Sequence, residues 1–410
     1  MSEESPVPGQ ENWPVLFCRQ VAKNARYWAE LVAAHPADAP ELHRERDNIV
    51  KALGRALQLD AAWEPAADLL LGFHKCVERQ GALADWERFV QASLKISRRH
   101  GDVATEAALL DRLGELKRDQ GDWTAAADCH RQAYEMCDGL GDEAGCARAL
   151  TNLGQVRRLQ RRYREAKQAL EEALARYEAS QDLQMQASAL INLGLVYFDE
   201  CQWEKALASQ QAAFQIWSET GNAEGMARAQ HNMGIAYQWL GDLPQAESSL
   251  RSAIALYEKT YSRLYLAVAS MDLGNVYLGQ GQPDRAETLY RQAINVMEGM
   301  RYARGLAQAF NNLGMACTQQ RKWDLAEDSF RRSIRLWRQL GEPVSQANAE
   351  DNLAEAYLKQ RRWEAAWEVA NMALERLRGL APEGRVEGLL SDINEHLRTA
   401  EAGLGGVVEA

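Results

Sequence analysis

The stretch INLGLVYFDECQWEKALASQQAAF (residues 191–214) decides the fold, because its pattern returns at a fixed interval along the chain. Forty residues earlier the sequence reads TNLGQVRRLQRRYREAKQALEEAL (151–174), and forty residues later it reads HNMGIAYQWLGDLPQAESSLRSAI (231–254). Each copy carries asparagine, an apolar residue and glycine within its first four positions. A fixed period of roughly 20–50 residues is typical of structural repeats that stack side by side.

Seven blocks of forty residues align without a gap over residues 111–390. The fourth position is glycine in six blocks and alanine in the seventh, and the sixteenth position is alanine in all seven. Small residues in these two columns allow the backbones of two helices to approach closely. Residues 71–110 match the pattern more loosely, so we predict eight helix pairs over 71–390, of which the first is degenerate.

Each block predicts two α-helices. In the quoted stretch the first helix is expected over about 184–200 and the second over about 203–219, because apolar residues recur three and four positions apart. Gly-Asp pairs such as Gly141-Asp142 mark the breaks, since glycine takes the left-handed position that ends one helix and aspartate caps the next. Block 231–270 lacks this glycine, so we expect an altered joint over residues 261–266.

The small–x–leucine–glycine pattern, the tyrosine that often follows it by three positions and the alanine at position 16 resemble the tetratricopeptide repeat. The forty-residue unit is similar to the long repeats of Pins and kinesin light chain. The resemblance implies an all-α fold, a right-handed α-solenoid of stacked antiparallel helix pairs whose first helices line a concave groove. The segment 25–58 is similar to helices that join the NTPase core to the repeats in bacterial STAND regulators. The sequence has no glycine-rich phosphate loop ending in Gly-Lys-Ser/Thr, so the NTPase itself is not expected here.

These patterns divide the chain into four parts. Residues 1–12 are expected to form a flexible tail, 13–70 an N-terminal helical segment, 71–390 the helix pairs, and 384–402 a C-terminal capping helix with a polar outer side. The last pair needs such a cap, because its apolar face would otherwise meet water. We expect the residues after the cap to be frayed.

The bulk composition argues against several classes of protein. Among the 410 residues no stretch of about 18 uncharged apolar residues would span a membrane, and the acidic start lacks the apolar core of a secretion signal. The seven cysteines are scattered and odd in number, which is typical of reduced thiols, so we predict a cytoplasmic protein. A net charge of −11 argues against nucleic acid as the main partner.

The pattern of chemically active residues predicts neither an enzyme nor a cofactor or metal site. The seven histidines form no HxxxH or HExxH pair in the sequence. His130 occupies a column that holds Leu170, Leu250, Tyr290 and Phe330 in other blocks. We therefore interpret His130 as a structural histidine of the core.

A column of asparagines marks the candidate binding site, one residue before the core leucine on the first helix of most blocks. The resemblance implies that this face looks into the groove, where an amide can hold a peptide backbone because it offers both a donor and an acceptor. Alternatively, the asparagines bond the neighbouring repeat and fix the stacking. The predicted peptide-binding residues are Asn152, Asn192, Asn232, Asn275, Asn312, Arg148, Arg228, Leu195, Ile235, Trp239 and Met315.

The predicted lining of the groove changes along its length. The N-terminal side holds Asp111 and Glu115, and the C-terminal side holds Asp351 and Glu355. An exposed apolar patch between charged ends is typical of an interface, whereas a tight superhelix or a homodimer would bury the patch. The apolar positions near the middle are Ile191, Leu195, Phe198, Ile235, Trp239, Val268, Met271, Leu278 and Met315.

Together these features predict a non-enzymatic module that binds an extended or helical segment of another protein in the groove. The competing prediction is a ligand-responsive sensor or regulatory subunit of a bacterial signalling or defence system, associated with a STAND NTPase or a protease. Assembly into a homo-oligomer is compatible with both predictions.

Overall fold

The structure, a computed structural model, describes residues 13–35, 40–80, 83–380 and 385–408. Within these ranges every regular element is a helix, which confirms the predicted all-α class. The tail predicted over residues 1–12 lies outside the described residues. The elements are α1 (Trp13–Ala34), α2 (Pro40–Ala56), the 3-10 helix η1 (Asp60–Ala62), α3 (Trp63–Gln80), α4 (Leu83–His100), α5 (Val103–Asp119), α6 (Trp123–Leu140), α7 (Glu143–Leu159), α8 (Tyr163–Ser180), α9 (Leu183–Asp199), α10 (Trp203–Thr220), α11 (Ala223–Trp239), α12 (Leu243–Lys259), α13 (Arg263–Gly279), α14 (Pro283–Gly299), α15 (Ala303–Gln319), α16 (Trp323–Leu340), α17 (Pro343–Lys359), α18 (Trp363–Leu377) and α19 (Arg385–Val408).

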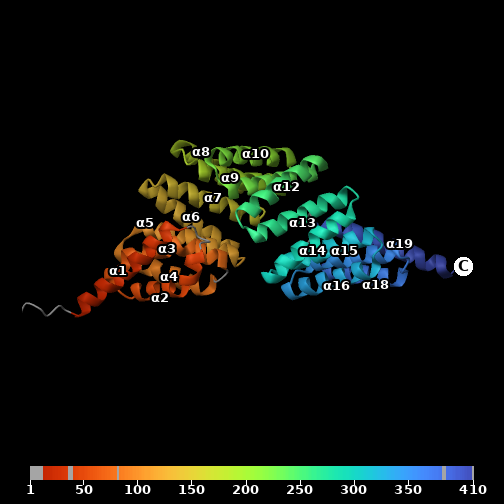
Figure 1. Cartoon of the computed structure of the whole chain (residues 1–410), viewed down its shortest axis with the longest axis horizontal. Coiled ribbons are helices and arrows are strands. Elements are labelled where there is room, and N and C mark those ends of the chain that lie inside the picture. The colour runs from red at the N-terminus through yellow and green to blue at the C-terminus, as the bar shows by residue number, and fades with distance from the viewer. Residues whose placement is uncertain (1–12, 36–39, 81–82, 381–384, 409–410) are drawn as a thin grey trace, which may run out of the picture. The chain divides into compact units, whose positions relative to one another are not determined.

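The chain divides into two compact units, residues 1–196 (the N-terminal unit) and residues 197–410 (the C-terminal unit). Inside each unit consecutive helices pack as pairs joined by tight turns, as Figure 1 shows for α5 with α6 and for α15 with α16. The first helices of successive pairs also touch, since α5 contacts α7 and α15 contacts α17. Each unit is therefore a stack of helix pairs, an α-solenoid. We call the surface made by these first helices the first-helix face.

In the N-terminal unit, α1 packs against α2 and α3, and α3 leads through α4 into the regular pairs. Fully buried Phe73 and Leu70 of α3 belong to the same hydrophobic cluster as Leu109 of α5. Because α3 begins at Trp63, the boundary predicted at residue 70 falls inside this helix.

Glycine and aspartate form the turns in the way that the sequence predicts. Gly141 has a φ of +68°, and the carboxylate of Asp142 caps α7 by accepting the backbone N–H of Gly145 at 2.9 Å. Gly241 and Asp242 repeat this geometry before α12. Local sequence therefore sets where each helix ends and the next one starts.

The altered joint predicted over residues 261–266 is wrong. Tyr261 itself takes the left-handed position, with a φ of +54°, and α13 begins at Arg263, forty residues after the start of α11. Cys201 and Arg301 take the same conformation at other breaks. A side chain in this region costs some backbone strain, but the register of the repeats is kept.

The glycine column lies where the two helices of a pair pack together. A Cβ built on Gly314 of α15 would lie 2.6 Å from the ring of Phe330 on α16, so a hydrogen atom at this position is needed for the ring to fit. In the last pair Ala354 replaces glycine, and the residue in the column of Phe330 is Ala370. Both alanines are fully buried in one cluster. The two columns therefore vary together, with glycine facing a large side chain and alanine facing a small one.

Glu287 ties α14 to the turn that precedes α16. Its carboxylate accepts hydrogen bonds from Lys322 Nζ at 2.8 Å and Gln320 Nε2 at 2.9 Å, and it pairs with Arg291 at 2.8 Å. Burial acts to raise the pKa of Glu287, but these three donors outweigh it and lower the pKa to about 2. The charged carboxylate is thus part of what holds successive repeats together.

We expect Glu287→Gln to remove about 1 kcal/mol from the free energy of unfolding at neutral pH, because the carboxylate is partly screened by water. A carboxylate with a lowered pKa stabilises the fold above its unfolded value of 4.5 and loses this effect as the pH falls towards its folded value of about 2. The substitution should therefore flatten the stability curve over this window, as measured by urea denaturation at several pH values. Glu298→Gln, at an exposed position of the same helix, is the control, and parallel curves for Glu287→Gln and the parent protein would contradict the prediction.

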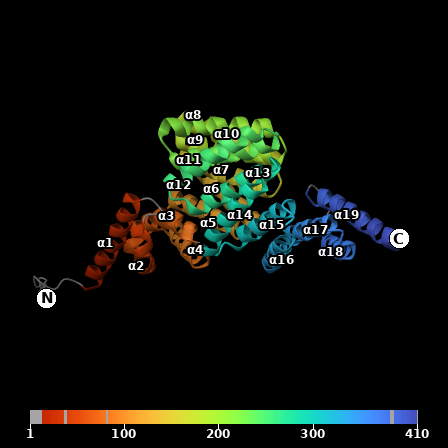
Figure 2. The same ribbon diagram turned by 45° about the vertical axis from the view of Figure 1, so that its right-hand side comes forward.

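Helix α19 covers the C-terminal end of the C-terminal unit, where it contacts α17 and α18 (Figure 2). Its side chains Leu389 and Ile393 are buried in a cluster with Leu377 of α18. The helix continues to Val408, where we expected fraying after residue 402. Glycine at position 403 favours this extension, because a Cβ there would overlap the indole ring of Trp363.

Candidate functional site

The first-helix face of the C-terminal unit carries a polar cavity of about 200 Å³, formed by α13, α15 and α17 together with Trp337 of α16. Most of its lining side chains carry an amide, a hydroxyl or a carboxylate. We call this cavity the amide pocket. Its polar residues are Asp272, Asn275, Gln308, Asn311, Asn312, Ser345 and Asn348.

The forty-residue period explains why amides collect in the amide pocket. The first helices α13, α15 and α17 begin at residues 263, 303 and 343, so residues of one column lie at the same level on adjacent helices. Gln308 and Asn348 share one column in this way, and Asp272 and Asn312 share another. On α15, Gln308 and Asn312 are four residues apart and therefore lie on one side of the helix.

Hydrogen bonds between amides link the three helices. Asn312 donates through Nδ2 to Asn275 Oδ1 at 2.9 Å, and Asn352 of α17 donates to Asn311 Oδ1 at 3.0 Å. Tyr290 fixes the same oxygen of Asn275 by donating its hydroxyl at 2.8 Å. The predicted stacking role of the asparagines is therefore observed at Asn312 and Asn352. An amide has further donors and acceptors beyond one such bond, so stacking and ligand binding are compatible.

Two of the predicted peptide-binding residues, Asn275 and Asn312, line the amide pocket. A third, Met315, is half-buried on α15, with its sulfur 3.8 Å from Asn311 Nδ2. Two further lining residues, Asn311 and Ser345, were not predicted from the sequence. The two consecutive asparagines at positions 311 and 312 are the sequence feature from which this pocket could have been predicted.

The other predicted asparagines lie outside the amide pocket. Asn152 is buried and donates to Asp111 Oδ1 of the neighbouring repeat at 3.1 Å. Asn192 is buried and donates to the Ser188 carbonyl of its own helix at 3.0 Å. Asn232 is half-buried and donates to Gln210 of α10 at 3.2 Å. The predicted stacking role therefore also extends to Asn152 and Asn232, which bond the preceding helix pair, whereas Asn192 bonds its own helix.

Asp111 is the centre of a buried polar cluster in the N-terminal unit. Its carboxylate lies 2.8 Å from Nδ1 of the fully buried His130 and 3.2 Å from Nε of Arg148, and it also accepts the hydrogen bond from Asn152. Burial acts to raise the pKa of Asp111, but the His130 ring and nearby charges outweigh it and hold the pKa below its usual value. Assigning Asp111 to a solvated groove was therefore wrong, because His130 of α6 and the side chains of Arg148 and Asn152 on α7 surround it. Asp351 was also predicted in the solvated groove, but it is buried, with only 4% of its surface exposed.

Trp239 is the most exposed of the predicted apolar anchors, with 61% of its surface accessible. Its ring stacks on Trp203 at a centroid distance of 5.1 Å, and Phe198 meets Trp203 edge-on at 4.8 Å. All three rings belong to the C-terminal unit. Ile235, on the same helix as Trp239, is half-buried. The rings form an aromatic surface that could hold an apolar side chain.

The remaining predicted lining residues divide between surface and core. Arg228 is exposed, and Leu195, Phe198 and Val268 are half-buried. The prediction that Ile191 and Leu278 are exposed in the groove is wrong, because these side chains are at most 9% exposed. Met271 is 5% exposed but lines the amide pocket.

No group of three or more histidine, cysteine, aspartate or glutamate side chains among the described residues could hold a metal ion. The seven cysteines are present as free thiols. None of the described helices has the length and apolar character that crossing a membrane requires.

A tetratricopeptide repeat family model matches residues 105–179, 185–259, 225–299 and 305–379, which together make up more than half of the chain. The chain belongs to the tetratricopeptide repeat family. The resemblance carried by the glycine, alanine and tyrosine columns is thereby confirmed. Among curated protein sequences none matches this tetratricopeptide repeat protein.

Several solved structures resemble this tetratricopeptide repeat protein in fold. A Rap protein complexed with competence and sporulation factor has a TM-score of 0.61 at 16% identity, covering 92% of this chain and 99% of its own. The STAND protein with a tetratricopeptide repeat sensor from Pyrococcus horikoshii has a TM-score of 0.61 at 15% identity, covering 86% of this chain and 55% of its own. The apo quorum sensor NprR from B. thuringiensis has a TM-score of 0.58 at 13% identity, covering 88% and 99%. At these identities the likeness shows the fold alone.

Proposed function

We propose that this tetratricopeptide repeat protein is a non-enzymatic module that binds an extended segment of another protein along its first-helix face. The observation that carries the proposal is the amide pocket, where side chains from three successive first helices converge. Its volume of about 200 Å³ is below the roughly 300–1,000 Å³ of pockets for drug-sized ligands. A short piece of peptide chain fits this size better than a cofactor does.

The chemistry of the amide pocket suits a peptide main chain. An extended chain presents N–H and C=O groups at every residue, and asparagine and glutamine side chains can pair with both. Gln308 is exposed and Asn348 half-buried, so they can bond a ligand without first leaving the core. Such binding depends little on the ligand's side chains. Within the same unit, Trp239 and Ile235 would add selectivity by receiving an apolar side chain.

The structural neighbours support a second, finer version of this function. These neighbours are a Rap protein in complex with competence and sporulation factor, a STAND protein with a tetratricopeptide repeat sensor, and a quorum sensor. By analogy, binding of a peptide to this chain would change the arrangement of its repeats and act on a partner protein in the cytoplasm. This version predicts a change in radius of gyration by small-angle X-ray scattering when the peptide is added, and an unchanged scattering profile would count against it.

The experiment that tests the proposed function places a photoreactive amino acid at position 348, inside the amide pocket, and a second one at position 295, an exposed site on α14. Crosslinking in the native host followed by mass spectrometry identifies the segment that lies at each position. We expect one defined protein segment at position 348 and no shared segment at position 295. The same products at both positions would mean that the amide pocket is not a binding site.

The segment found in this way allows a direct affinity test. Asn348→Ala should weaken binding of the synthetic segment about fivefold to tenfold, the value of one hydrogen bond, without lowering the melting temperature. Asn312→Ala should weaken it as much and also lower stability slightly, because its bond to Asn275 is lost. Asn295→Ala is the matched control and should change neither quantity. Unchanged affinity in both pocket variants would contradict the proposed function.

A further inference from the structure

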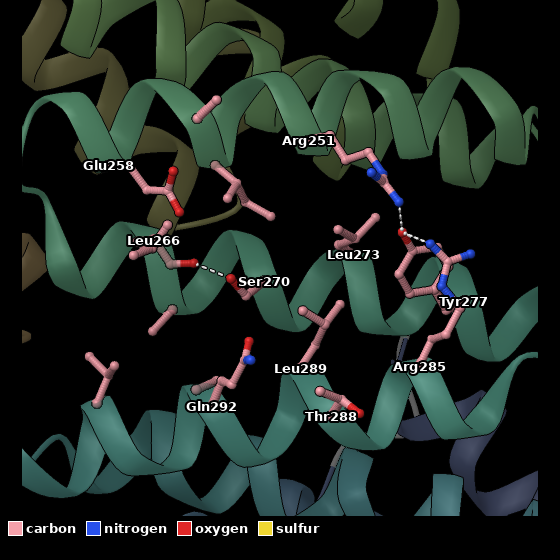
Figure 3. A pocket seen from close by; sticks show the side chains of 15 residues that line it. Arg251, Glu258, Leu266, Ser270, Leu273, Tyr277, Arg285, Thr288, Leu289 and Gln292 are labelled. Carbon is pink, nitrogen blue, oxygen red and sulfur yellow. Dashed lines mark hydrogen bonds between the residues drawn. The ribbon is translucent and has the colours of Figure 1, made fainter.

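A separate cleft of about 580 Å³ lies on the opposite, second-helix side of the C-terminal unit, between α12 and α14 with α13 as its floor (Figure 3). Its inner surface is apolar, whereas its rim residues, such as Ala255, Thr288 and Gln292, are exposed. Leu273 and Ala267 of the floor are buried. The principal apolar side chains are Ile254, Leu266, Leu273, Leu289 and Val296.

The forty-residue columns show which side chains occupy the corresponding space in other repeats. Between α6 and α8, the guanidinium of Arg176 lies 5.7 Å from the ring centre of Tyr134. Three periods later the same two columns hold Val296 and Ile254, which are too short to bridge the helices in this way. An apolar gap therefore remains where the N-terminal unit has a cation–π contact.

A second bridging pair is also replaced. Between α15 and α16, Arg332 lies 5.4 Å from the ring centre of Phe310. One period earlier the two columns hold Gln292 and Ser270, and both line the cleft. Ser270 directs its hydroxyl to the Leu266 carbonyl of its own helix at 2.8 Å, so the floor has no free hydroxyl for a polar ligand there. The cleft thus favours an apolar occupant.

The two ends of the cleft carry opposite charge (Figure 3). At one end Arg251 and Arg285 each donate to the Tyr277 hydroxyl at 2.7 Å, and Tyr277 donates to Glu247 at 3.0 Å. Two guanidinium groups against one carboxylate leave this end positive. Their side chains remain 55% and 46% exposed, so they can still meet an acidic group. At the other end stands the exposed carboxylate of Glu258.

We propose that this cleft binds an amphipathic α-helix of a partner protein, with acidic residues in its first turn at the arginine end and a basic residue in its last turn at Glu258. The wall from Arg285 to Val296 spans eleven residue steps, which is about 16 Å at 1.5 Å per residue, or three helical turns. A groove walled by two helices receives apolar side chains spaced three and four residues apart. The charge order also matches the order that the helix dipole favours in the bound helix itself.

A display library of 14-residue helical peptides tests this proposal on the full-length protein. The library varies the apolar positions and contains equal numbers of acid-first and base-first charge orders. We expect selection to enrich acid-first peptides, and the best peptide to lose at least tenfold in affinity when its charged ends are exchanged. Enrichment of both orders alike would overturn the proposed polarity and with it the proposal.

Variants taken from the chain's own columns locate the site. Val296→Arg introduces the arginine that its column holds at position 176, and Gln292→Arg introduces the one that its column holds at position 332. Each substitution should therefore fill the cleft without unfolding the protein. Both should weaken the selected peptide at least tenfold. Asn295→Arg, an exposed neighbour outside the cleft with the same change of charge, should leave the affinity unchanged. Equal affinity for the parent, Val296→Arg and Gln292→Arg proteins would overturn the proposal.

Discussion

Asp111→Ala should lower the free energy of unfolding of the N-terminal unit by about 3–5 kcal/mol, the largest effect that we expect from one substitution. Asp111 is 2% exposed and is the shared acceptor for His130, Arg148 and Asn152. Its removal leaves the buried ring of His130 and the amide of Asn152 without this partner. Urea denaturation, followed by circular dichroism, measures the change.

Two further substitutions separate the loss of the acceptor from a general effect of removing charge. Asp111→Asn keeps one oxygen acceptor in place and should recover part of the lost stability. Asp128→Ala removes a carboxylate that is 55% exposed and pairs with Arg131 on its own helix. It should change stability by less than about 0.5 kcal/mol. Equal effects of Asp111→Ala and Asp128→Ala would show that the cluster is not what stabilises this unit.

Gly314→Ala should destabilise the C-terminal unit by about 2–3 kcal/mol, although alanine favours a helix more than glycine does. The added Cβ would lie 2.6 Å from the Phe330 ring, so α15 and α16 must move apart or the ring must leave its rotamer. At Gly299, by contrast, a Cβ meets no atom within 4 Å. Gly299→Ala is therefore the control, and it should be neutral or slightly stabilising.

The chain itself suggests the compensating change for this clash. Where Ala354 replaces glycine, Ala370 takes the place of the facing ring. In a double-mutant cycle, Gly314→Ala and Phe330→Ala should therefore be less destabilising together than the sum of their separate effects, by about 1–2 kcal/mol. Strict additivity of the two effects would mean that the two positions do not compete for the same space.

The sequence predicted the repeat register closely because local chemistry sets it. The starts of α9, α11, α13, α15 and α17 are forty residues apart, each fixed by a left-handed break and a small-residue column that lie within the block. Tyr261 shows the limit of this reasoning. The missing glycine suggested a different joint, but the packing on both sides of the break is strong enough to hold tyrosine in a left-handed conformation.

The candidate site was less predictable than the fold, because the role of a polar side chain depends on its partner in space. Asn275 and Asn312 were predicted and do line the amide pocket. The period could not show that Asn192 bonds its own helix. Nor could it show that Asp111 is buried, which follows from a histidine occupying a core column on the facing helix.

If amides on the first-helix face hold the main chain of a partner segment, replacing backbone groups of that segment should weaken binding more than replacing its side chains does. The segment crosslinked at position 348 is synthesised with single N-methylated peptide bonds, which remove one N–H each, and with single alanine substitutions. We predict at least a tenfold loss of affinity for N-methylation at two or more adjacent bonds, with a smaller loss for alanine at the same residues. Tight binding of every N-methylated peptide, with the losses confined to side-chain substitutions, would show that the amides do not hold the main chain.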